Sequence, residues 1–360
     1  MRITANQVTV GRLVPMPLLA WLIYRGADYG YKDNGYMWAA LIAGILIGCT
    51  DWVDGMLARR QGPTVLGGLL DPIADKVFIA FAYTPFADSR SHVALVSAWA
   101  CALMFVREFF ITALRSAYEQ RNLSLRTSYL AKAKTWTQMQ GIGVMLLFPL
   151  VANRPFLIGL LVVGVLGPLV AMAGLYATKK TVWRGAITMS ASFAAALALF
   201  LWWPEYTIEG IMLGVVAITW ASGLDYIIAG WPKLRARGDF ARADFVRLVG
   251  AIAMPVLLFA VLVDTDAPRW TIYAILSFEL AVGGLDNLLS HHKAATEALA
   301  WGGRVLGISA LLGGALLVPA HADKFAIVAT ALSIIGVAAE FWRGRDYYLD
   351  ARLREKAARG

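Results

Sequence analysis

Charged residues are scarce in this chain, and their scarcity excludes a soluble globular protein. Asp, Glu, Lys and Arg make up 16% of the 360 residues, whereas about 25% is usual in soluble domains. Hydrophobic residues make up 59%, in apolar runs long enough to cross a bilayer. The sequence therefore predicts an integral membrane protein. Its formal net charge of +9 then favours contact with anionic lipids over nucleic acid.

The chain has only two cysteines, and its start lacks the features of a cleavable signal peptide. Cys49 and Cys101 stand apart in apolar sequence, without CxxC spacing or a nearby histidine, so we expect inert packing residues. The start, MRITANQVTVGRLVP, has polar residues in its n-region and no A-x-A site soon after its apolar run. We therefore expect the first span to be retained rather than cleaved.

The apolar runs predict an all-α, polytopic membrane helix bundle of about 12 transmembrane helices. Each run is close to the roughly 20 residues that a spanning helix needs. Turn signals such as Asn-Arg-Pro at 153–155 separate several of them. The expected spans are 9–25, 36–56, 72–88, 92–116, 131–151, 155–177, 184–203, 207–230, 243–263, 269–290, 300–319 and 323–342.

The distribution of basic residues predicts the orientation. With a cytoplasmic N-terminus and twelve spans, the inside connections hold most of the 33 Lys and Arg residues, as the positive-inside rule requires. We therefore expect both termini to be cytoplasmic. The outside loops hold only Arg25, Lys32, Arg90, Arg154, Arg269 and Lys324.

A basic linker at 233–247 is the longest polar interruption after residue 130 and predicts a domain boundary. The chain would then comprise residues 1–235 and an additional membrane helical domain, 240–360. Glu279 and Asp286 are acids within the second part, but their spacing supports no site assignment.

Four aspartates fall within the stretch DWVDGMLARRQGPTVLGGLLDPIADK at 51–76. A single carboxylate near a helix end often just reaches the membrane interface, but this set has helical spacing. Asp51 and Asp54 are three residues apart, Asp71 and Asp75 are four apart, and the glycine-rich stretch 59–68 reads as a turn. Two antiparallel helices would thus present two carboxylate pairs to each other at one membrane face.

Such a cluster needs cations, because four close carboxylates repel one another strongly. Ligation by carboxylates alone, without a nearby His or Cys, favours Mg²⁺ or Mn²⁺ over Zn²⁺. Two such ions could clamp the oxygens of a phosphoryl displacement. Gly55 and Ala58 leave room for a ligand beside the helix, and Arg59 can meet a phosphate. The pattern predicts a site for a metal-bound diphosphate.

The pattern D-x2-D-G-x2-A-R followed by G-x3-D-x3-D resembles the signature of the CDP-alcohol phosphotransferase family. Seven residues separate Arg59 from Gly67, where eight are common in the family, which we attribute to turn length. The matching positions are Asp51, Asp54, Gly55, Ala58, Arg59, Gly67, Asp71 and Asp75.

The resemblance implies a fold, a reaction and roles for these residues. Two metal ions would be bound by Asp51, Asp54, Asp71 and Asp75, and Asp75 would also be the general base that deprotonates the acceptor alcohol. The CDP-lipid would lie against Gly55, Ala58, Arg59 and Gly67. Because the family core usually has six helices, the spans near 155–203 resemble an insertion in a core formed by residues 1–235.

Further motifs favour one branch of the family, the phosphatidylglycerol-phosphate synthases. The segments REFFITALR at 107–115 and AKAKTWTQ at 131–138 resemble its fourth and fifth helices. The implied acceptor is glycerol 3-phosphate, its phosphate held by basic side chains, although anchoring by positive-inside residues would explain these equally. Softer matches are N-x2-T-x2-R-x4-P at 6–17 and S-G-x2-Y at 222–226. The expected phosphate ligands are Arg107, Arg115, Lys132 and Lys134.

The sequence thus predicts a metal-dependent phosphatidyltransferase in the inner membrane, with its active site facing the cytoplasm. Expected partners are CDP-diacylglycerol, glycerol 3-phosphate, membrane lipids and a second copy in a homodimer. Alternative acceptors within the family are inositol phosphate, serine and phosphatidylglycerol. A secondary transporter is disfavoured, because the acids gather at one face in a single helix-turn-helix rather than at the midplane.

Overall fold

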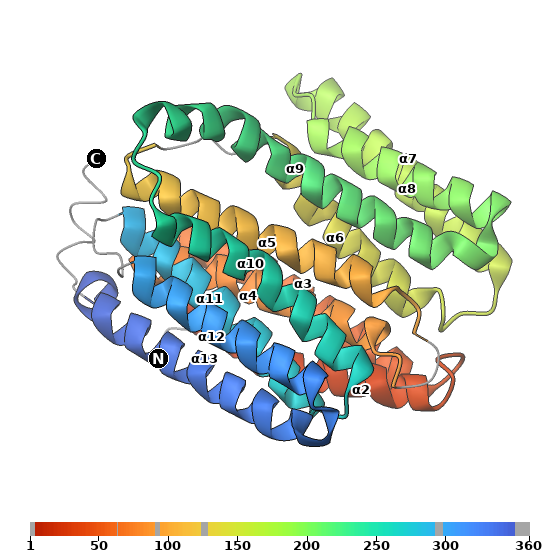
Figure 1. Cartoon of the computed structure of the whole chain (residues 1–360). Coiled ribbons are helices and arrows are strands. Elements are labelled where there is room, and N and C mark those ends of the chain that lie inside the picture. Colours follow the sequence, from red (N-terminus) through yellow and green to blue (C-terminus); the bar gives the residue numbers. More distant parts are fainter. Residues whose placement is uncertain (1–3, 63, 91–93, 124–128, 292–297, 350–360) are drawn as a thin grey trace.

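A computed structural model describes residues 4–62, 64–90, 94–123, 129–291 and 298–349, and within these ranges the chain is helical and has no strand. The helices lie side by side in an elongated bundle (Figure 1). The all-α prediction is therefore confirmed. The helices are α1 Ala5–Leu13, α2 Met16–Asp28, α3 Gly35–Gln61, α4 Val65–Ala87, α5 Ala98–Gln120, α6 Tyr129–Leu147, α7 Arg154–Lys179, α8 Arg184–Trp202, α9 Thr207–Arg237, α10 Arg242–Asp264, α11 Arg269–His291, α12 Ala298–Leu317 and α13 Ala322–Leu349, with 3-10 turns η1 Pro204–Tyr206 and η2 Pro319–His321.

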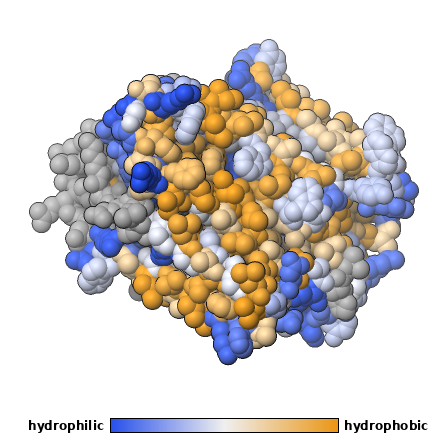
Figure 2. Space-filling model, viewed as in Figure 1, coloured by the Kyte–Doolittle hydropathy of each residue, from blue (hydrophilic) through white to orange (hydrophobic). Residues whose placement is uncertain are grey.

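The surface of the bundle is that of a membrane protein. Figure 2 shows hydrophobic side chains across the middle of the viewed face and hydrophilic ones gathered towards its margins. Seven of the described helices are long and apolar enough to cross a membrane. Helices α4 and α5 are not among these seven, because each carries several charged residues, and such residues within a membrane bundle mark functional positions.

The first expected span, 9–25, is instead two helices. Helix α1 ends at Leu13 and α2 begins at Met16. The break falls at Pro15, and Pro17 lies in the first turn of α2. Proline has no N–H to donate and clashes with the preceding turn, so a continuous helix through both prolines is disfavoured. As a result α1 packs against both α3 and α4.

The turn between α3 and α4 is shorter than the sequence predicts. Helix α3 continues to Gln61 and ends where Gly62 adopts φ +88°, a conformation that other residues rarely tolerate. Thr64 then caps α4 by accepting a 2.9 Å hydrogen bond from the backbone N–H of Gly67. Both ends of the glycine-rich stretch thus belong to helices, which holds the two acid-bearing segments at a fixed distance.

Helix α9 joins the N-terminal bundle, and α7 with α8 forms a hairpin at its edge (Figure 1). Helix α9 packs against α5 and α6, whereas α7 and α8 pack mainly on each other. Leu157, Leu161, Ala196 and Phe200 form a separate small apolar cluster within the hairpin. The hairpin is therefore peripheral to the helices that carry the acids.

The C-terminal helices α10–α13 pack directly on this bundle. Helix α10 lies against α5, and α11 lies against both α4 and α5. One apolar core runs from Met16 in α2 to Ala329 in α13. One apolar core therefore includes helices from both sides of the basic linker that was predicted as a domain boundary.

The intramembrane acids of the C-terminal part are engaged in ion pairs. Glu279 pairs with Arg304, and Asp286 lies 3.4 Å from Arg247. Both carboxylates are almost completely buried. Helices α10, α11 and α12 are thereby joined by charge pairs, which explains why acids occur in an otherwise apolar segment.

Asp88, the first residue after α4, ties that end of the helix to α11. Its carboxylate accepts a hydrogen bond from Arg269 at 2.7 Å and from Nε of Arg90 at 3.1 Å. Burial tends to raise the pKa of this carboxyl, but the two arginines outweigh burial and lower the pKa below its usual value. The folded protein therefore stabilises the charged form of Asp88.

Candidate active site

The four aspartates of the signature come together where α3 ends and α4 begins. Carboxylate oxygens of Asp51, Asp54 and Asp71 all lie within 4.8 Å of one another, an arrangement that could hold a metal ion. Asp75 lies one turn further along α4 and shares a cationic partner, Arg12, with the other three. The i, i+3 and i, i+4 spacings thus produce a single cluster.

Arg12 in α1 is the cationic centre of this cluster, and the sequence assigned it no role in the site. One terminal nitrogen lies 2.5 Å from Asp51, and the other lies 3.0 Å from Asp71 and 3.1 Å from Asp75. Its Nε lies 3.9 Å from Asp54. The side chain is buried, and its only sequence signal was its place in N-x2-T-x2-R-x4-P.

The same motif supplies two more contacts from α1. Thr9 donates a 2.9 Å hydrogen bond to the buried carboxylate of Asp54. Asn6 accepts a 3.1 Å hydrogen bond from Thr64, the cap of α4. Since Asn6, Thr9 and Arg12 recur at intervals of three, all three point from one side of α1 into the α3–α4 pair.

A cavity of ≈ 630 Å³ opens beside the aspartates. Asp54 and Asp71 contribute to its wall, and so do Gly55, Ala58 and Gly67, three of the residues expected to contact the CDP-lipid. Arg59 is not among the lining residues and is exposed, but a Cβ at Gly55 would lie 3.6 Å from its guanidinium nitrogen. Arg59 therefore stands at the rim.

Gly67 lies where the side chains of Asn6 in α1 and Thr64, the cap of α4, come close to the backbone of α4. A Cβ at this position would lie 2.8 Å from the side-chain oxygens of both Asn6 and Thr64, closer than real contacts allow. At the adjacent Gly68 a Cβ would meet nothing within 4 Å. A side chain would therefore be crowded at Gly67, the signature glycine, but not at Gly68.

The donor set fits hard divalent cations. Four carboxylates face a single guanidinium, so the cluster keeps a large negative charge that Mg²⁺ or Mn²⁺ could neutralise. All the candidate ligand atoms are carboxylate oxygens, the type these ions prefer. The acidic triad can therefore bind metal, as the sequence predicts.

A second charged cluster lies on the neighbouring helices, around the buried Glu108 of α5. Its carboxylate accepts a 2.6 Å hydrogen bond from Lys134 of α6 and lies 3.3 Å from Arg107. Lys76 of α4 lies 3.9 Å from the same carboxylate and donates to Thr112 at 2.9 Å. Three cations thus surround one acid.

This basic cluster adjoins the aspartates. Lys76 follows Asp75 directly in α4, so the two clusters share one turn of that helix. Arg107 and Lys134 were expected at such a site, whereas Lys76 was not. Its sequence signal was its place directly after the last signature aspartate.

Arg115 and Lys132 are placed differently from the other two expected phosphate ligands. Arg115 lies over the ring of Tyr226 in α9, 5.7 Å from its centre. Lys132 is exposed. Since residues two apart on a helix do not share a face, Lys132 points away when Lys134 reaches Glu108.

Helix α9 closes this region through its S-G-x2-Y segment. Ser222 accepts a 2.7 Å hydrogen bond from Arg107. A Cβ at Gly223 would lie 3.2 Å from Nε of Arg107. These contacts place α9 in the same bundle as α1–α6.

Residues 2–167 match the model of the CDP-alcohol phosphatidyltransferase family. The chain belongs to this family and is a transferase. The family match covers α1–α6 and ends within α7, so it includes every signature aspartate and both expected basic helices.

Curated relatives agree with this assignment. The chain is 30% identical to the CDP-diacylglycerol–glycerol-3-phosphate 3-phosphatidyltransferase of Bacillus subtilis (strain 168) over 158 residues, 42% of this chain and 78% of the relative. It is 32% identical to a probable phosphatidylglycerophosphate synthase of Mycobacterium tuberculosis (strain H37Rv) over 144 residues, 40% of this chain and 65% of the relative. No solved structure matches the chain.

Proposed function

We propose that this protein transfers the phosphatidyl group of CDP-diacylglycerol to glycerol 3-phosphate and releases CMP, a step of phospholipid biosynthesis. The observation that carries the proposal is that an acidic and a basic cluster lie next to each other. A four-carboxylate cluster with an adjacent cavity lies next to a cluster of three cations. The first suits a metal-bound diphosphate and the second suits a phosphorylated acceptor. The names of the relatives point to the same reaction.

The aspartates would hold two divalent ions, Mg²⁺ or Mn²⁺, between α3 and α4. Bound there, the ions would neutralise the diphosphate and stabilise the leaving CMP. Asp51, Asp54, Asp71 and Asp75 supply the carboxylates, and Arg12 and Thr9 fix their positions. The cytidine portion would occupy the cavity along Gly55, Ala58 and Gly67, with Arg59 at its rim.

Asp75 would act as the general base. It directly precedes Lys76 of the basic cluster in the sequence, which places it nearest that cluster along α4. The hydroxyl of glycerol 3-phosphate would give its proton to Asp75. Its oxygen would form a bond to the phosphorus that carries diacylglycerol, while the bond from that phosphorus to the CMP oxygen breaks.

The acceptor phosphate would be held by the cations around Glu108. A neutral alcohol would not need three cations at one carboxylate, whereas a phosphate would use their spare donors. Arg107 and Lys134 are the nearest of the expected ligands, and Lys76 joins them. Arg115 and Lys132 stay candidates from the sequence resemblance.

The chain is an integral membrane protein, and we infer that its active site faces the cytoplasm of the inner membrane. The positive-inside pattern supports this orientation. The termini themselves, residues 1–3 and 350–360, lie outside the described residues. A homodimer within the lipid bilayer is our expectation for its assembly.

An acceptor screen tests the proposal. Purified protein in detergent micelles would be incubated with CDP-diacylglycerol, Mg²⁺ or Mn²⁺, and each candidate acceptor, and released CMP would be measured. Rapid release with glycerol 3-phosphate that stops on chelation of the metal is the expected result. Turnover with inositol phosphate, serine or phosphatidylglycerol in its place would overturn the choice of acceptor.

A further inference from the structure

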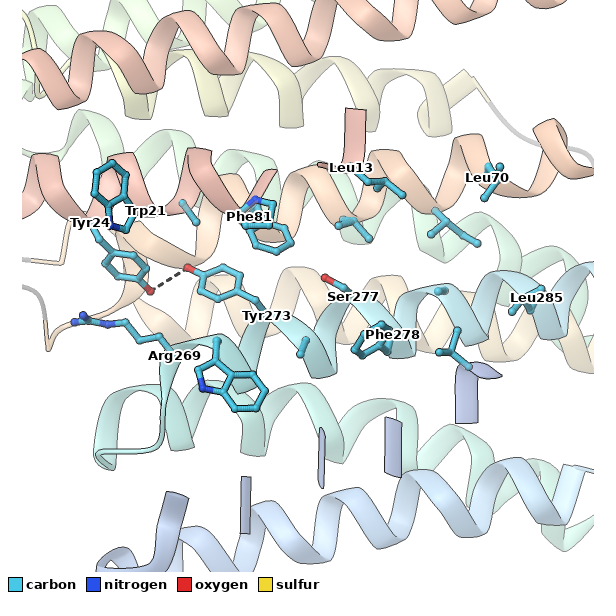
Figure 3. Close-up of a pocket in the computed structure, with 18 of the residues that line it drawn as sticks. Leu13, Trp21, Tyr24, Leu70, Phe81, Arg269, Tyr273, Ser277, Phe278 and Leu285 are labelled. Atoms are coloured by element: carbon cyan, nitrogen blue, oxygen red, sulfur yellow. Dashed lines mark hydrogen bonds between the residues drawn. The ribbon is translucent and has the colours of Figure 1, made fainter. Parts of the chain in front are cut away.

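A long groove of ≈ 810 Å³ runs along the bundle between α2, α4, α11 and α13. Figure 3 shows its lining, in which Phe81 of α4 stacks on Tyr273 of α11. Val337 and Phe341 of α13 add to the wall. The groove is almost entirely apolar, apart from one end, and it is separate from the cavity beside the aspartates.

The length of the groove matches an acyl chain. Along α4 its lining runs from Leu70 to Phe81, and eleven residues of α-helix rise about 17 Å. One leaflet contributes about half of a hydrocarbon core that is roughly 30 Å thick. A single lipid chain entering from one membrane face would therefore fill the groove along its length.

The two ends of the groove differ in chemistry. At one end lie Leu70, the sequence neighbour of Asp71, and Leu285 (Figure 3). At the other end lie Tyr24 and Arg269. This polar end is at the membrane face opposite the aspartates, because it adjoins the last turns of α2 and the first residue of α11.

A hydrogen-bonded network builds the polar end. Tyr273 donates to Tyr24 at 2.9 Å, and Tyr24 donates to Asp88 at 3.2 Å. Arg269 lies over the ring of Tyr24, 4.4 Å from its centre, while its Nε binds Asp88. The aromatic pair and the arginine are thus held in place before any ligand arrives, so a headgroup would meet an ordered surface.

The charge at this end suits an anion. Arg25 and Arg269 line the groove, and together with Arg90 they outnumber the two carboxylates they pair with, Asp28 and Asp88. The side chains of Arg25 and Arg269 are both 39% exposed, so a ligand can approach each of them. Trp21 and Trp270 stand beside them, largely exposed, as tryptophans do at the membrane interface.

We propose that this groove binds one acyl chain of an anionic phospholipid whose phosphate is held by Arg25 and Arg269. The donor substrate is a poorer occupant, because a chain starting at the aspartates would place its methyl end among tyrosines and arginines. Helices α11 and α13 form half of the groove, so the C-terminal helices would create a lipid site that the matched N-terminal region cannot form alone. The inference does not depend on the acceptor or on the transfer reaction.

Filling the groove tests the proposal. Ala281 of α11 lines it between Phe278 and Leu285, and Ala281→Trp would occupy the space of the chain. Ala331→Trp is the matched control, because Ala331 is exposed on α13 and is not a lining residue. Each protein would be delipidated and mixed with phosphatidylglycerol or phosphatidylcholine. Native mass spectrometry would then measure the amount of bound lipid.

We expect the wild type and Ala331→Trp to retain one phosphatidylglycerol, and Ala281→Trp to bind it roughly ten-fold more weakly. Arg25→Gln should reduce the preference for phosphatidylglycerol over phosphatidylcholine. If Ala281→Trp does not fold, Ala274→Phe, at another lining position, replaces it. Equal retention by the groove-filled and control proteins, or no preference between the two lipids in the wild type, would overturn the proposal.

Discussion

The guanidinium of Arg12 lies 3.1 Å from the carboxylate of Asp75, and through this contact α1 meets the last aspartate of the signature. Arg12 reaches Asp51 and Asp71 as well, although they are 39 and 59 residues away in sequence. The short α1 therefore organises the acidic cluster.

Asp75→Asn should lower CMP release by roughly 10²- to 10⁴-fold, the range for losing a general base. The amide keeps the packing, and Asp51, Asp54 and Asp71 still offer carboxylates to a metal ion, so the fold and much of the CDP-lipid binding should remain. Single-turnover assays with labelled donor would measure both binding and release. Normal turnover in this variant would contradict the assignment of the base.

Arg12→Gln should destabilise the protein when metal is chelated, by about 2 kcal/mol, because one cation is removed from a cluster that is partly screened by solvent. Mg²⁺ should restore more stability to this variant than to the wild type, since the ion takes over the neutralisation. Thermal unfolding with EDTA and with Mg²⁺ provides the measurement. Equal responses to Mg²⁺ in the two proteins would argue against a metal at the aspartates.

Gly67→Ala should disturb the contact of α1 with α4 at a cost of about 1–3 kcal/mol, because its Cβ would overlap Asn6 and Thr64. We expect a higher KM for the CDP-lipid as the cavity wall shifts. Gly68→Ala is the matched control, since its Cβ enters open space and should have a smaller effect. An equal rise in KM for both variants would show that sterics at Gly67 do not matter.

Lys134→Gln should raise the KM for glycerol 3-phosphate roughly ten-fold, about 1.4 kcal/mol of lost binding, with a smaller change in kcat. Lys134 lies in the basic cluster, whereas Lys132 is exposed, so Lys132→Gln should have the weaker effect. Steady-state kinetics with varied acceptor separate the two. A larger effect from Lys132 would move the acceptor site away from Glu108.

Asp88→Asn should lower the free energy of unfolding by about 2 kcal/mol at neutral pH, because the hydrogen bonds from Arg90 and Arg269 lose their charged acceptor. The lowered pKa of Asp88 makes this stabilisation complete above the ordinary carboxyl pKa of about 4, and it is lost as the pH falls through the lower native pKa. The gap between wild type and variant should therefore narrow in acid.

Chemical unfolding of both proteins between neutral and acid pH checks this dependence. Asp264→Asn is a suitable control, because Asp264 is exposed at the same end of the bundle. A gap between Asp88→Asn and the wild type that stays constant with pH would mean that the charge of Asp88 contributes nothing.

The sequence by itself determined the features that depend on local spacing. Apolar runs of bilayer length fixed the helical membrane fold, and the three- and four-residue intervals of the aspartates fixed which faces of two helices carry acid. The order of these residues also identified the family. Helical periodicity depends only on residues that are close in sequence, so these features could be predicted without knowing any distant contact.

Only the tertiary structure decided which distant groups meet. In the folded chain, Arg12 is the common partner of the four aspartates. Lys76 lies in the basic cluster, whereas Lys132 is exposed and lies outside it. The tertiary structure also packed α11 and α13 against α2 and α4 to form the groove. Contacts of this kind join residues far apart in sequence, and they arise when whole helices bury their apolar faces together, which no short sequence pattern encodes.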